Sequence, residues 1–173
     1  MKSFVQLLSF GLLVTCPSAI ASVNGRQETV YALTVASKDN EDLNGQVLEV
    51  SDSVLGVYEG DKTPVQVYPT ANGDFNSLHT WPVGIVDHVL GLKGDNGLYT
   101  LVDLMDTKDK DTADGSYYDT FLLKGGLVTQ NLPGGWIAFP TTNGWNVKWS
   151  DGTAFVPQSF VSVDIVYNEV QEQ

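Results

Sequence analysis

The chain is almost free of cysteine and poor in cations, and each shortage excludes a class of protein. Its single cysteine, Cys16, lies near the N-terminus, so the rest of the chain has no thiol for a disulfide, a thiolate metal site or a cysteine nucleophile. Nine Lys and Arg face 21 Asp and Glu, which gives a net charge of −12. Nucleic acid and anionic membranes both attract clustered cations, so neither is an expected partner. We interpret the acidity as a contribution to solubility.

Catalytic signatures are missing as well. The sequence has no Gly-x-Ser-x-Gly nucleophile elbow, no glycine-rich phosphate loop and no Asn-x-Ser/Thr glycosylation site. Its two histidines, His79 and His88, would form a metal site only with carboxylates from elsewhere in the fold, and we interpret His88 as an ordinary strand residue. Among 21 acidic residues, some pair always stands near enough for a glycosidase, so that pattern carries no signal. We expect no enzyme and no cofactor.

The first 21 residues have the pattern of a secretory signal peptide. Lys2 provides a positive start, the run Phe4–Val14 is largely apolar, and Ala19–Ala21 offers small residues at the spacing that a signal peptidase reads. The apolar run is too short to span a bilayer. We therefore predict a signal peptide over 1–21 and a secreted β-rich domain over 22–173. The expected location is extracellular or in a cell wall, without a membrane span.

The remainder of the chain reads as short strands separated by turns. Runs rich in β-formers stand at 30–35, 46–50, 53–58, 65–68, 86–92, 98–104, 118–123, 136–139, 145–149 and 160–167. Between them lie turn pairs at 44–45, 72–73, 96–97, 114–115, 143–144 and 151–152, each Asn-Gly or Asp-Gly. No stretch keeps a helical period over three turns. The sequence predicts one all-β domain, an antiparallel β-sandwich or barrel.

Two segments of this pattern resemble each other. Val54–Asp61 and Val89–Asp95 are both strands that run into a Gly-Asp turn, and Leu122–Gly126 is a faint third copy. Three clear copies would indicate a β-trefoil. We keep the trefoil as a minority alternative.

The strand at 145–149 carries the one aromatic pattern that suggests binding. Trp145, Val147 and Trp149 alternate with polar residues and share one strand face. Such a face is more often core, where large aromatic rings contribute strongly. The other interpretation is an exposed platform on which sugar rings stack, and it requires Trp145 or Trp149 to be exposed.

An acidic loop is a weak candidate for a metal site. Its oxygen ligands would come from Asp106, Asp109, Asp111 and Asp114. Calcium needs such ligands at alternate positions, but Ala113 occupies one ligand position, and Lys108 and Lys110 would repel a cation. We prefer the interpretation of a solvated loop.

The C-terminal half resembles a known family. The segments that carry the resemblance are Phe121–Leu127, Gly135–Pro140 and Asn143–Trp149, with the sequences FLLKGGL, GWIAFP and NGWNVKW. They are similar to segments of the secreted fungal cell-wall proteins related to the phialide protein PhiA. Phe139 stands where that family often has cysteine. The resemblance implies a fungal extracellular or wall-associated protein with a β-rich domain and no catalytic residues.

Three functions remain open from the sequence. The leading one is a non-enzymatic structural or interaction protein, secreted or bound to the cell wall. The second is a carbohydrate-binding, lectin-like module, and the third is a small polysaccharide hydrolase. The expected partner is accordingly a wall polysaccharide or an extracellular protein, and an effector role on a host protein is not separable from the first function.

Overall fold

The protein is built from one antiparallel sheet that closes on itself. The computed structural model describes residues 28–60, 63–105 and 116–170. Their strands form a nine-stranded antiparallel barrel with extra strands. The described residues contain no α-helix, only the single 3₁₀ turn η1 (Glu41–Leu43), and none of their helical segments is long and apolar enough to cross a membrane. The all-β expectation is confirmed, in its barrel form rather than as a sandwich or trefoil.

Two sequence predictions fall outside the described residues. These are the signal peptide at 1–21 and the four-aspartate loop within 106–114. Both stay predictions.

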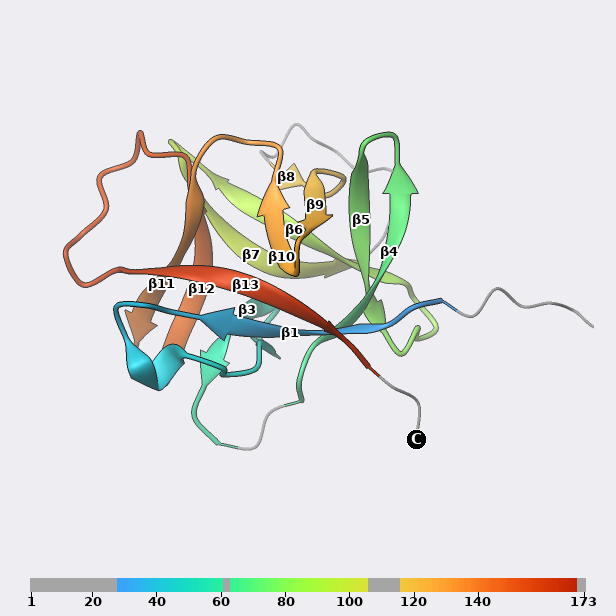
Figure 1. The fold of residues 1–173 in the computed structure, drawn as a ribbon, viewed down its shortest axis with the longest axis horizontal. Helices are drawn as coiled ribbons and strands as arrows, with labels where there is room; N and C mark the ends of the chain where they lie inside the picture. The colour runs from blue at the N-terminus through green and yellow to red at the C-terminus, as the bar shows by residue number, and fades with distance from the viewer. Residues whose placement is uncertain (1–27, 61–62, 106–115, 171–173) are drawn as a thin grey trace, which may run out of the picture.

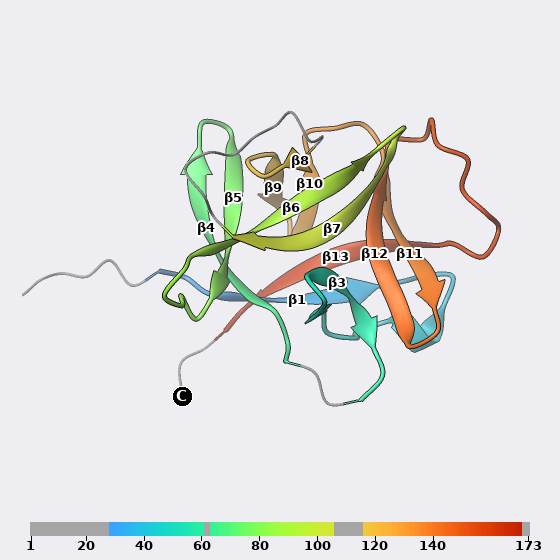
Figure 2. The same cartoon turned by 180° about the vertical axis from the view of Figure 1, so that it is seen from behind.

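Some strands that are neighbours in the barrel are also neighbours in the sequence, whereas others come from distant parts of the chain (Figures 1 and 2). Their bounds are β1 Tyr31–Ala36, β2 Glu49–Ser51, β3 Val54–Tyr58, β4 Gln66–Asn72, β5 Phe75–Trp81, β6 His88–Asp95, β7 Leu98–Met105, β8 Ser116–Tyr117, β9 Phe121–Lys124, β10 Leu127–Gln130, β11 Gly135–Thr141, β12 Gly144–Ser150 and β13 Val161–Glu169. The order is β1-β4-β5-β9-β10-β13-β11-β12-β3-β7-β6-β8, and the further pairings β1–β13, β5–β6 and β12–β7 close the sheet.

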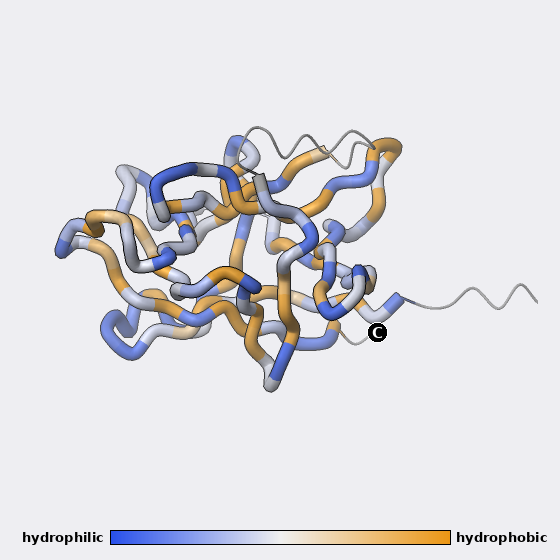
Figure 3. Tube along the Cα trace, turned by 90° about the horizontal axis from the view of Figure 1, so that it is seen from above, coloured by the Kyte–Doolittle hydropathy of each residue, from blue (hydrophilic) through white to orange (hydrophobic). Residues whose placement is uncertain are grey.

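Alternation of side chains places the core inside the barrel. In β13, Val163 and Ile165 are buried while Ser162 and Asp164 are exposed, as the sequence pattern predicts. Figure 3 shows the consequence, with hydrophobic stretches along the strands and hydrophilic ones at many of the turns. The interior is filled by aliphatic side chains and by Phe121, which is fully buried.

Tight turns connect neighbouring strands where the sequence has Asn-Gly. Between β6 and β7, Asn96 and Gly97 have φ values of 50° and 79°. Two consecutive positive φ angles are the signature of a type I′ turn, which matches the twist of a hairpin. Asp95 pairs with Leu98 directly across this turn. The predicted hairpin is thus formed.

Candidate functional site

The strand face with Trp145 and Trp149 points into the core. Trp149 is only 3% exposed, Val147 is fully buried, and Trp145 is half-buried and packs against the core. The Trp149 indole N–H donates to the carbonyl of Pro133 over 3.2 Å, and its ring meets Trp136 edge to face at 5.0 Å. Trp149 therefore offers no free ring face to a sugar, and this face lacks a platform of two exposed rings.

A different hairpin carries exposed aromatic and polar groups together. We define the outer aromatic face as Gln66, Tyr68 and Thr70 of β4 with His79 and Trp81 of β5. Gln66 pairs with Trp81, and Tyr68 with His79, across the two strands. The Tyr68 and His79 rings stack at 5.0 Å, and Trp81 stands edge-on to Tyr68 at 6.2 Å. With 42% of its surface exposed, Trp81 is the most exposed of the four tryptophans.

Hydrogen bonds hold His79 rigidly beneath this face. Its Nδ1 lies 2.9 Å from Oδ2 of Asp87, and its Nε2 lies 2.8 Å from the Thr70 hydroxyl. Because a carboxylate only accepts hydrogen bonds, Nδ1 carries a proton, and Nε2 accepts from the Thr70 hydroxyl when the ring is neutral. Hydroxyl, imidazole and carboxylate thus stand in the order of a nucleophilic triad. His79 is itself 7% exposed, and its evident effect is to fix the ring on which Tyr68 stacks.

An apolar loop borders the outer aromatic face. After Trp81, the chain exposes Val83, Ile85 and Val86 before it reaches β6. Met105 at the end of β7 pairs with the first residue of β6 and is 60% exposed. Exposed apolar side chains that lie close together in one loop, as Val83, Ile85 and Val86 do, are typical of contact regions.

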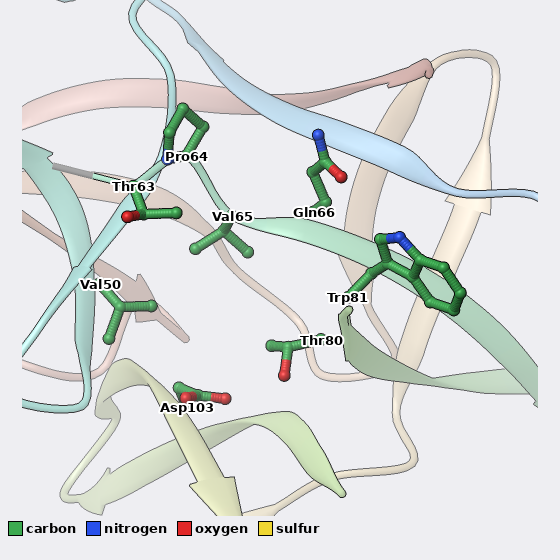
Figure 4. A pocket seen from close by; sticks show the side chains of 8 residues that line it. All are labelled: Val50, Thr63, Pro64, Val65, Gln66, Thr80, Trp81 and Asp103. Carbon is green, nitrogen blue, oxygen red and sulfur yellow. The ribbon is translucent and has the colours of Figure 1, made fainter. Parts of the chain in front are cut away.

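A pocket of about 360 Å³ lies at the end of the barrel, on the inner side of the same hairpin. Its lining residues are Val50, Thr63, Pro64, Val65, Gln66, Thr80, Trp81 and Asp103. In Figure 4 the side chains of Val50, Val65, Thr80 and Asp103 converge, whereas the indole of Trp81 points away from them. Trp81 thus belongs to the outer aromatic face and only borders the pocket.

The carboxylate in this pocket is fixed by the second histidine. Nδ1 of His88 lies 2.9 Å from Oδ2 of Asp103. Oδ1 of Asp103 is buried and finds no hydrogen-bond donor among the described residues. Asp103 is the sole charged residue among the lining residues that the structure describes. Within the parts of the chain that the structure describes, no three His, Cys, Asp or Glu side chains gather closely enough to hold a metal ion.

Comparisons of the chain with known protein families, with curated proteins and with solved structures find no match. The site therefore rests on its own geometry.

Sequence reasoning overlooked most of this site. It did not single out Trp81 or His79, and it interpreted His88 as an ordinary strand residue. One signal for Trp81 was present, since apolar residues follow it directly in a segment with Pro82 and Gly84. Apolar side chains in a turn-like segment cannot all be core, so they indicate an exposed surface.

Proposed function

We propose that the protein is a non-enzymatic secreted protein that associates with cell-wall polysaccharide by binding carbohydrate on the outer aromatic face. The observation that carries this proposal is the exposed Trp81 indole, held edge-on against Tyr68. Sugar rings present C–H faces that pack on aromatic rings, and their hydroxyl groups need polar neighbours. Gln66 and Thr70 supply an amide and a hydroxyl beside the rings.

Rigidity of the face supports the same function. His79 is bonded at both ring nitrogens, and Tyr68 stacks on it. A ligand that docks on rings already held in place loses less conformational entropy than one that must order them. The signal-peptide pattern and the resemblance to wall proteins agree with an extracellular ligand of this kind.

Hydrolysis of polysaccharide is the weaker alternative. A glycosidase needs two carboxylates on either side of the scissile bond. The pocket has one, Asp103, among the described lining residues. The proposal is therefore binding without cleavage.

A protein partner is the second candidate function, and the apolar loop after Trp81 favours it. Ile85 is fully exposed, with Val83 and Val86 beside it in the sequence. A partner would bury these side chains. Binding to an extracellular protein rather than to polysaccharide would then be observed.

The test is a pull-down of the secreted protein with insoluble chitin, β-glucan and mannan, followed by tryptophan fluorescence with soluble fragments. We expect saturable binding to one of them, and a loss of about fivefold in affinity or more in Trp81→Ala, since a stacked aromatic contact contributes about 1 kcal/mol. Phe155→Ala is the matched control, because Phe155 is a 91% exposed aromatic residue outside this face. Absence of binding, or equal loss in both variants, would reject the proposal.

A further inference from the structure

The pocket at the barrel end holds a carboxylate oxygen that lacks a partner. Oδ1 of Asp103 is fully buried and has no donor among the described residues, while Oδ2 is engaged by His88. A buried carboxylate oxygen without a donor is more costly than a missing neutral hydrogen bond. A ligand that brings a donor to Oδ1 would remove this cost.

The walls around Asp103 combine one hydroxyl with apolar groups. Figure 4 shows the Thr80 side chain pointing toward the Asp103 carboxylate, with Val50 and Val65 on the other side of the pocket. The pocket volume of about 360 Å³ lies at the small end of the range for ligand sites, about 300–1,000 Å³. Such a space suits a molecule of a few heavy atoms with one polar end.

We infer that this pocket binds a small organic ammonium ion. Its N–H group donates to the Asp103 carboxylate, reaching Oδ1 once the side chain turns that buried oxygen toward the pocket, and a second N–H donates to the Thr80 hydroxyl oxygen. The short alkyl part packs against Val50 and Val65. Gln66 and Trp81 of the outer aromatic face also line the pocket, but neither of the proposed polar contacts, Asp103 and Thr80, belongs to that face. The inference therefore does not depend on carbohydrate binding there.

Charge selects an ammonium ion over a neutral alcohol. Among the lining residues that the structure describes, the one charged side chain is that of Asp103, and the whole chain has a net charge of −12, so the negative potential attracts cations. Hydrogen bonds from a charged donor to a carboxylate are about twice as strong as neutral ones.

Geometry selects an organic cation over a metal ion. Calcium takes six to eight oxygen ligands, and magnesium demands an octahedron of them. The described residues hold no cluster of three metal-ligating side chains, and among them Asp103 is the one carboxylate that lines the pocket. An ammonium ion needs one carboxylate and one hydroxyl, and it gains from the valine walls.

The experiment is an NMR titration of the purified secreted protein with n-butylammonium chloride. The readout is the methyl signals of Val50 and Val65. n-Butanol serves as the neutral probe of the same size, and potassium chloride as the salt control. We expect saturable shifts with the ammonium ion, at least tenfold weaker binding of n-butanol, and no such shifts with the salt.

Two variants assign the binding to its residues. Asp103→Asn should weaken n-butylammonium binding at least tenfold, whereas Asp164→Asn, at an exposed carboxylate on β13, should leave it unchanged. Thr80→Val keeps the side-chain shape and should weaken binding severalfold, and it tests the site even where Asp103→Asn does not fold. Equal binding of n-butanol, shifts produced by the salt alone, unchanged binding in Thr80→Val, or no saturable shift would overturn the inference.

Discussion

Asp87 and His88 are neighbours in the sequence, yet their side chains bind on opposite faces of the sheet. Asp87 accepts from His79 on the outside, and His88 contacts Asp103 on the pocket side, each pair at 2.9 Å. His79 and Thr80 are adjacent in β5 and point to these two faces in turn. Hydrogen bonds on both faces of the sheet thus fix the start of β6. They also fix the position of the outer aromatic face relative to the pocket.

The two histidines should differ in their contribution to stability. His79→Ala leaves Asp87 without its donor, removes both hydrogen bonds and takes away the ring beneath Tyr68, so we expect a loss of about 2–3 kcal/mol in the free energy of unfolding. The His88 side chain is 39% exposed and makes one hydrogen bond, to Asp103, so His88→Ala should cost about 1–2 kcal/mol through the loss of that donor. Urea denaturation of both variants measures the difference. A larger loss in His88→Ala would contradict the assigned roles.

Replacement of Trp149 should lower stability, whereas replacement of Trp81 should weaken ligand binding and leave stability nearly unchanged. Trp149 is buried against Trp136, so Trp149→Ala should destabilise the fold by about 3–5 kcal/mol through a large cavity. Trp81→Ala removes an exposed ring and should change the free energy of unfolding by less than about 1 kcal/mol. Thermal or urea unfolding provides the comparison. If Trp81→Ala unfolds the protein as strongly, its ring is structural and the carbohydrate platform is not supported.

Local patterns predicted much of the barrel because they depend on residues close in sequence. The alternation in β13 and the Asn96–Gly97 hairpin both follow from such patterns. β5 was not predicted, because Phe75–Trp81 carries Asn, Ser, His and Thr in place of β-branched aliphatic residues. Its pairing with β4 and β6 decides its conformation, and tertiary context of this kind outweighs local preference.

The candidate site could not be predicted because its residues meet only through strand pairing. Thr70 and His79 come together across the β4–β5 hairpin, and Asp103 reaches His88 from β7. Nothing in the spacing of these residues distinguishes them from other polar residues on strands. The same limitation applied to Trp145 and Trp149. The strand pattern showed that the two residues share a face, but not whether that face lies inside or outside the barrel.

Tyr58 should give the protein a stability loss at high pH. Burial raises the pKa of Tyr58 to about 12, and the carboxylates of Asp52 and Glu49 add to the effect. Its hydroxyl lies 2.9 Å from Oδ1 of Asn146 and 3.1 Å from the carbonyl of Val54, both acceptors, so it must keep its proton to donate.

The sign of this effect follows from proton linkage. The folded state holds the Tyr58 proton more tightly than the unfolded state, whose pKa is near 10. The stabilisation is complete below pH 10 and is lost as the pH rises toward 12. Urea denaturation across this range should show a steeper decline for the wild type than for Tyr58→Phe, which has no proton to lose. Parallel declines would contradict the assignment to Tyr58.

Gly144 should be intolerant of any side chain. It opens β12 with φ at 134°, and a Cβ atom there would lie 2.1 Å from the carbonyl oxygen of Val57 and 2.8 Å from the Cα of Tyr58. Both are backbone atoms of β3, so they cannot swing aside as a flexible side chain would. Gly144→Ala must therefore push β3 away from β12 and break the pairing of Gly144 with Tyr58. We expect a loss on the order of 3 kcal/mol or more.

Gly152→Ala separates this collision from backbone strain alone. Gly152 also has a positive φ, 84°, but a Cβ atom there meets nothing within 4 Å. Its replacement should cost only the strain of an alanine in a left-handed conformation, about 1–2 kcal/mol. The difference between the two variants in urea denaturation measures the close approach of β3 and β12. Equal losses in the two variants would mean that β3 and β12 can move apart enough to accommodate a methyl group at position 144. The close contact of Gly144 with Val57 would then not be essential to the barrel.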